Sequence, residues 1–343
     1  HMTEVITNVL NNLYTFGPII ALSYVINLSE KKRTPLHPKY GREMALVCYL
    51  LISFGYIASF LIGLVIQLRG NVFLKLFSKS LSTDLIWKIQ LIGLGLWLPS
   101  LLGILVLIPA VRRWLSRILQ IQAENRIHAF ALSMSMLVFM QMIITLGVGL
   151  DTLSQTSQPQ SSPGILAMLW SQDILLAFMG LIGVGWLSRR TFRQTLERLG
   201  LKKITTKQLL IGLVVGLVMM VISNFVENIA YTQGWMGDPH VEELTNKLLG
   251  PLFTSIPGIL TLGLAAALGE EIIFRGALLP RFGLIYTSIL FALVHANYGI
   301  SAATLVVFLL ALVLSLVRYR YNTTVCMIIH ATYNISLGIL SLK

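Results

Sequence analysis

Apolar runs alternate with short polar stretches along almost the whole chain. The runs reach roughly 16–25 residues, enough to cross a bilayer core of about 30 Å at 1.5 Å per residue in a helix. We predict ten spans, of which the eighth is short and is expected to be tilted or half-buried. The spans are 6–28, 43–68, 89–111, 129–150, 164–187, 208–226, 252–274, 284–296, 301–317 and 323–341. The pattern therefore predicts an all-α polytopic membrane protein with about ten transmembrane helices and no β-sheet.

Composition supports this prediction. The 343 residues are 55% hydrophobic and 12% charged, and the mean hydropathy is +0.78, outside the range of soluble proteins. The net charge of +12 does not indicate nucleic-acid binding, because the Lys and Arg residues lie between the apolar runs, where membrane proteins carry them. We expect membrane lipids as partners and no nucleic acid.

The basic residues are distributed unequally between alternate connections. Twenty Lys and Arg residues lie in one set of connections and five in the other. By the positive-inside rule the rich set is cytoplasmic, which predicts that both termini lie outside. The rich set consists of 29–42, 112–128, 188–207, 275–283 and 318–322.

The connection 188–207 divides the chain into two predicted units, a five-span scaffold of unassigned role at 1–187 and a functional unit at 188–343. Within the connection, Phe192, Leu196 and Leu199 have helical spacing among seven basic residues. This pattern fits a short helix on an anionic membrane surface, and it fits a solvated basic loop equally well.

Ionisable residues inside the spans concentrate in the second unit. Such residues are costly in a bilayer and mark functional sites. The exception in the first unit is Asp173, which we expect to pair with Asn224, Glu227 or a backbone group.

The seventh span ends in Glu270-Glu271-Ile-Ile-Phe-Arg275. Residues four apart share a helix face, so Glu271 is expected to pair with Arg275. Glu270 points about 100° away from its neighbour and has no helical partner. An isolated buried carboxylate suits a general base, although a salt-bridged helix end would carry the same residues.

Two further polar faces follow. Phe291 and His295 lie four residues apart in the eighth span, and His330 and Asn334 do so in the last. A histidine alone is more often a satisfied core residue. Asn must find partners in hydrocarbon, and His330 with Asn334 offers two donors for one developing negative charge, as an oxyanion hole requires.

Together these residues indicate a hydrolase in which Glu270 and His295 activate a water molecule. The sequence has no G-x-S-x-G, and its two cysteines, Cys48 and Cys326, lie inside apolar segments as core residues, so no covalent nucleophile is indicated. Two histidines and a glutamate would also suit zinc, which keeps a zinc-dependent variant open. A different class, a transporter, proton relay or partner-binding scaffold, would place carboxylates and histidines in spans as well.

The chain thus carries three motifs in order: E-E-x-x-x-R, F-x-x-x-H and H-x-x-x-N. Together with the flanking sequence EEIIFRGALLPRFG, they resemble the CPBP family of intramembrane glutamic endopeptidases. This family includes CAAX prenyl proteases and bacteriocin-processing proteins. The resemblance covers about 190–340. It implies a peptidase without a catalytic metal or other cofactor, acting on a membrane-associated, prenylated or leader-bearing peptide.

The resemblance also implies individual roles. Glu270 would activate water with help from His295, and His330 and Asn334 would form the oxyanion hole. The supporting residues would be Glu271, Arg275 and Phe291. The expected location is the cell membrane of a prokaryote, with the active site toward the cytoplasm.

Overall fold

The computed structural model describes residues 1–76 and 82–342, and over these residues the chain is helical without any strand. Nine of the helices described there are long and apolar enough to cross a membrane. They are α1 Met2–Lys32, α2 Arg42–Lys75, α3 Thr83–Leu105, α5 Arg126–Val148, α7 Ser162–Gly183, α9 Thr206–Thr232, the continuous segment Ile256–Leu293, α13 Ala302–Arg320 and α14 Thr323–Leu340. The predicted all-α membrane fold is confirmed.

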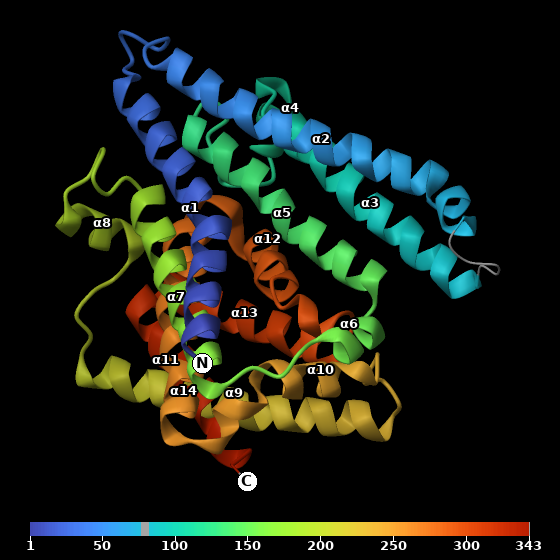
Figure 1. Ribbon diagram of the computed structural model, residues 1–343. Coiled ribbons are helices and arrows are strands. Elements are labelled where there is room, and N and C mark those ends of the chain that lie inside the picture. Colours follow the sequence, from blue (N-terminus) through green and yellow to red (C-terminus); the bar gives the residue numbers. More distant parts are fainter. Residues whose placement is uncertain (77–81, 343) are drawn as a thin grey trace.

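Shorter elements connect these helices. They are α4 Pro109–Leu115, α6 Leu150–Thr156, α8 Phe192–Leu199, α10 His240–Leu249 and the 3₁₀ turns η1 Gly250–Thr254 and η3 Ala296–Tyr298. In Figure 1, α2, α3 and α5 run as neighbours along one side of the molecule, and the C-terminal helices gather on the other.

The seventh and eighth predicted spans form one helical segment in the structure. It consists of α11 Ile256–Glu271, the π-helix η2 Ile272–Leu278 and α12 Leu279–Leu293. Gly283 bends the segment, with φ 78° and ψ 177° inside α12, a backbone conformation that glycine adopts without a Cβ clash. The short eighth span is thus the second arm of a bent segment, which explains nine long helices where ten spans were predicted.

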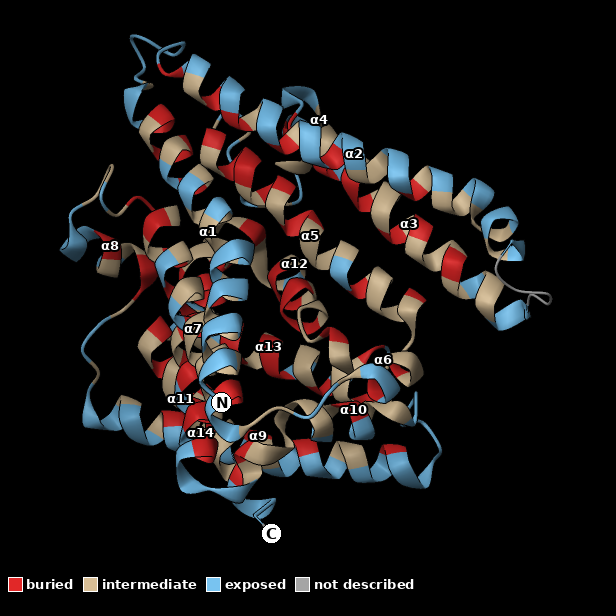
Figure 2. Cartoon of the chain, viewed as in Figure 1, coloured by how far each residue is buried: buried red, intermediate tan, exposed pale blue. Residues whose placement is uncertain are grey.

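The two predicted units contact each other through α7. This helix packs against α1 on one side and against α11 on the other. Exposed apolar side chains lie on the outer sides of α1, α2 and α9, whereas buried residues face the centre (Figure 2). An apolar outer surface is what lipid requires, because hydrocarbon offers no polar partner.

The connection 188–207 forms a helix rather than a loop without structure. Thr191 and Gln194 make a reciprocal capping box at the start of α8, which satisfies two free backbone groups. Leu199 is buried and Phe192 packs its ring against Trp186. The helical alternative is confirmed, while contact with an anionic membrane surface stays a prediction.

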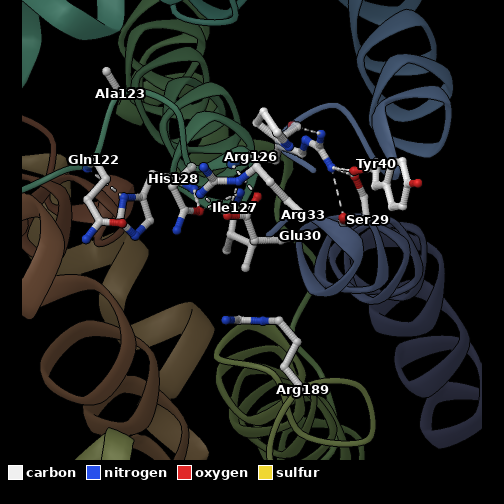
Figure 3. Close-up of polar contacts among 12 residues, drawn as sticks. Ser29, Glu30, Arg33, Tyr40, Gln122, Ala123, Arg126, Ile127, His128 and Arg189 are labelled. Carbon is white, nitrogen blue, oxygen red and sulfur yellow. Dashed lines mark hydrogen bonds and ion pairs between the residues drawn. The ribbon is translucent and has the colours of Figure 1, made fainter. Parts of the chain in front are cut away.

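A polar cluster ties α1 to α5 at one end of the first unit (Figure 3). The Arg126 guanidinium donates to the backbone oxygens of Ser29 at 2.8 Å and Tyr40 at 2.7 Å. Glu30 accepts from Arg33 Nε at 2.8 Å and from the Arg126 backbone N–H at 3.3 Å. Both oxygens of the Glu30 carboxylate are therefore hydrogen-bonded.

Candidate active site

Three of the four predicted catalytic residues converge at the junction of α11, α12 and α14. His295 Nε2 lies 3.7 Å from Glu270 Oε1, and His330 Nε2 lies 3.6 Å from Glu270 Oε2. Both separations exceed an ordinary hydrogen bond. Glu270 Oε2 is buried without a hydrogen-bond partner, so the two rings flank a carboxylate that is still able to bind another molecule.

One carboxylate oxygen of Glu271, the residue after Glu270, has two partners. Its Oε1 lies 3.1 Å from Arg275 Nη1 and 2.7 Å from His330 Nδ1. Both Glu271 and Arg275 have 0% exposed side chains. The predicted Glu271–Arg275 pair is present, but His330 also joins it, which the sequence did not predict.

Arg275 and Phe291 support this arrangement. The Arg275 guanidinium lies 4.1 Å above the centre of the Phe291 ring, a cation–π contact that is favourable when water is excluded. The same ring packs edge-on against His295 and His330. Phe291 therefore packs against the guanidinium and both imidazoles and helps to position all three.

The two histidines have different partners at Nδ1. His295 Nδ1 lies 2.8 Å from the Phe291 backbone oxygen, and since a carbonyl only accepts, this nitrogen carries the proton. His330 Nδ1 faces the Glu271 carboxylate, which accepts as well. Both rings thus direct Nε2 at Glu270, with a carboxylate behind His330 and a backbone carbonyl behind His295.

Asn334 lies one helical turn beyond His330 on α14. Its Nδ2 donates to the Leu262 backbone oxygen of α11 at 3.0 Å, two turns before Glu270. One of its two N–H groups is therefore occupied in tying α14 to α11, and the second remains for another acceptor. Among the contacts of the described residues, none joins Asn334 to Glu270.

Asp173 was assigned the wrong partner. The side chain does not pair with Asn224, Glu227 or a backbone group; it lies on α7 against Gly269 of α11, with its Oδ1 buried and without a hydrogen bond. The sequence singled out Asp173 because it is an isolated carboxylate among the first five predicted spans. Its neighbour could not be found from sequence, because Asp173 and Gly269 are 96 positions apart in the chain (269 − 173).

The π-helix places its carbonyl groups within reach of two arginines. Arg198 of α8 donates to the backbone oxygens of Gly276 at 2.9 Å and Ala277 at 3.2 Å. Arg318 of α13 donates to the Arg275 oxygen at 3.3 Å. A π-bulge disturbs the regular helix ladder and occurs mostly at functional sites. The basic connections predicted from charge thus hold the backbone immediately after Arg275.

The positions of the acidic and histidine side chains also show whether they could bind a metal ion together. Over residues 1–76 and 82–342, no three His, Cys, Asp or Glu side chains form a group that could hold a metal ion. The carboxylate and imidazole donors gathered here instead form pairs with one another, as Glu271 does with His330.

Comparison with known families agrees with the motifs. Residues 252–336 match the family described as type II CAAX prenyl endopeptidase Rce1-like. The matched segment contains Glu270, His295, His330 and Asn334, and it covers only part of the 190–340 stretch that the motifs suggested. Searches of curated proteins and of solved structures found no match. The chain is thus an integral membrane protein whose residues 252–336 match the Rce1-like CAAX endopeptidase family.

Proposed function

We propose that this protein cleaves a peptide bond of a membrane-associated substrate with a water molecule activated by Glu270. The observation that carries the proposal is the carboxylate of Glu270, flanked by two imidazole Nε2 atoms at 3.6 and 3.7 Å and left with one oxygen unpaired. A buried carboxylate without its own partner is expensive to maintain in a membrane. A reaction that uses it explains why it is retained.

In the proposed reaction, a water molecule binds at Glu270 and His295. The water oxygen attacks the peptide carbonyl carbon while its proton moves to the Glu270 carboxylate. Neutral His295 presents an unprotonated Nε2, because its Nδ1 donates to Phe291, and it accepts the second water proton as a hydrogen bond. Protonated Glu270 then transfers its proton to the departing amine. This is general acid–base catalysis by a single carboxyl group.

The oxyanion that forms on the substrate needs donors. His330, backed by the Glu271 carboxylate at 2.7 Å, supplies a charged Nε2–H, and Asn334 supplies its free N–H. One such donor contributes about 10²–10³ in rate. Arg275 binds the same Glu271 oxygen and holds that carboxylate in place behind His330.

The substrate is proposed to be a prenylated or leader-bearing peptide. It would approach from the cytoplasmic side of a prokaryotic cell membrane, where the basic connection 275–283 would place the bend of the segment. No metal or other cofactor takes part in this mechanism, and metal analysis of the purified protein tests that point directly.

The central experiment uses purified protein in liposomes with a prenylated CAAX peptide and the same peptide without its prenyl group. Wild-type protein should release the C-terminal tripeptide, and Glu270→Gln should not. Glu227→Gln is the matched control, because it makes the same substitution at a half-buried position of α9. Equal cleavage by the wild type and Glu270→Gln would refute the base role, and retained activity after metal chelation would refute the zinc variant.

A further inference from the structure

The carboxyl group of Asp173 lies at the closest approach between α7 and α11. The side chain is 3% exposed. A Cβ atom added to Gly269 would lie 2.5 Å from Asp173 Oδ1 and 2.7 Å from its Cα, so only glycine allows the two helices this close. Glu270 is the next residue, and its Oε2, like Asp173 Oδ1, is buried without a hydrogen-bond partner.

The packing around this point fixes Asp173 in place. One turn earlier on α7, Trp170 Nε1 donates to Thr261 Oγ1 of α11 at 3.0 Å. Two turns later, Gly180 packs directly against Ile272. These contacts on both sides of Asp173 hold α7 in one register along α11.

The helices that pack against α7 differ in the charged residues that they carry. On α11, Asp173 packs against Gly269, and the next residue, Glu270, has both histidines nearby, while Glu271 pairs with Arg275. On the opposite side of α7, helix α1 carries no acidic or basic residue between Glu4 and Glu30. Among the described residues no cation and no donor reaches Asp173 Oδ1, whereas Glu270 has two imidazoles nearby.

From this geometry we infer that Asp173 and Glu270 share one proton, which Asp173 holds while Glu270 carries the charge. Two adjacent carboxyl groups in a low-dielectric interior cannot both ionise. The charge stays on Glu270 because the imidazoles stabilise it there, and the Asp173 hydroxyl donates to the Glu270 carboxylate. Asp173 is therefore a positioning residue that acts through Glu270, and it is supplied by the N-terminal scaffold.

During the proposed reaction the Asp173 proton stays in place. The O–H bond of water breaks, its proton binds the second oxygen of Glu270, and that same proton leaves with the amine. Asp173 thus keeps Glu270 anionic between turnovers and aligns the oxygen that accepts the proton. This role rests on the proposed function, but the shared proton itself does not, and it can be measured without substrate.

Infrared spectroscopy of the whole protein in liposomes tests the shared proton. A protonated buried carboxyl group gives a C=O band that deuteration shifts. The wild type should show this band at neutral pH. Asp173→Asn should abolish it, whereas Glu270→Gln should retain it at a changed frequency because the hydrogen bond to a carboxylate is lost. The control Glu227→Gln should leave the band at the wild-type frequency.

Two results would overturn the inference. One is a band that persists unchanged in Asp173→Asn; the other is a band that Glu270→Gln leaves at the wild-type frequency. Should Asp173→Asn fold poorly, the wild-type and Glu270→Gln spectra still decide between these outcomes. If the spectra behave as expected but no peptide is cleaved, the proposed function fails while the proton-sharing pair stands.

Kinetics separates positioning from simple packing. Asp173→Val keeps the volume but removes the donor, so kcat should fall about 10- to 100-fold with KM unchanged, as expected for loss of a hydrogen bond to a charged group. Asp173→Asn retains an N–H donor and should recover most of that loss. Equal kcat for the Val variant and the wild type would contradict the positioning role.

Discussion

The molecule contains two buried polar clusters that are organised in opposite ways. In the cluster of Glu30 and Arg126 (Figure 3), both carboxylate oxygens and the guanidinium have hydrogen-bond partners. In the cluster at Glu270, buried polar atoms remain unpaired on four residues: Asp173 Oδ1, Glu270 Oε2, Glu271 Oε2 and Arg275 Nε.

The difference indicates what each cluster is for. A satisfied network stabilises one arrangement of helices, whereas an unpaired buried polar atom costs about 1–3 kcal/mol. With a proton shared between Asp173 and Glu270, Glu271 Oε2 and Arg275 Nε are still unpaired at this junction, so the protein gives up stability there. The first cluster holds helices together, whereas the unpaired groups of the second are consistent with the binding and chemistry proposed for it. Substitutions in the two clusters should therefore have opposite effects.

The largest effect is expected from Glu270→Gln. Cleavage should fall by at least about 10²–10⁴-fold, the contribution of a general base, while the midpoint of thermal unfolding stays equal or rises, because a buried charge is removed. Peptide release and unfolding are measured on the same preparation. A variant that is inactive and also clearly destabilised would contradict the proposed difference between the two clusters.

Asn334→Ala should lower kcat by about 10²–10³-fold if its free N–H meets the oxyanion. If the side chain only ties α14 to α11 through Leu262, kcat should change less than tenfold and the unfolding midpoint should fall instead. Steady-state kinetics with a prenylated peptide distinguishes the two outcomes. The test is needed because Asn334 is a candidate catalytic residue that also ties two helices together.

Arg126→Met should act in the opposite direction to Glu270→Gln. The apolar stem is kept, but the backbone oxygens of Ser29 and Tyr40 lose their donor, so the free energy of unfolding should fall by about 2–4 kcal/mol. The cleavage rate per folded molecule should be unchanged. Chemical denaturation in detergent gives the first quantity and active-site normalised rates give the second.

The smallest effect is expected at an exposed ion pair that belongs to neither cluster. Lys88 Nζ lies 3.1 Å from both oxygens of Asp151, and this hydrogen bond lowers the pKa of the Asp151 carboxyl group. Asp151→Asn should cost less than about 1 kcal/mol. A lowered pKa means that the contribution is present at neutral pH and is lost as pH falls below about 4, so wild type and variant should converge in acid unfolding experiments.

Hydrophobic length and helical periodicity alone determined the membrane class and the local pairs. Glu271 with Arg275, and Phe291 with His295, lie four residues apart on one helix face, so their proximity follows from helix geometry. The motifs likewise located the domain, because its polar residues are close together in the sequence. These features depend on neighbours along the chain and need no tertiary information.

Only the tertiary structure decided which groups meet across helices. It placed His330 between Glu270 and Glu271, where the sequence had paired it with Asn334. It also brought Asp173 of the N-terminal helices to Gly269 and merged two predicted spans through a π-helix and a bend at Gly283. Contacts between helices depend on their rotation and register, which packing of side chains sets and which hydrophobic patterns leave open.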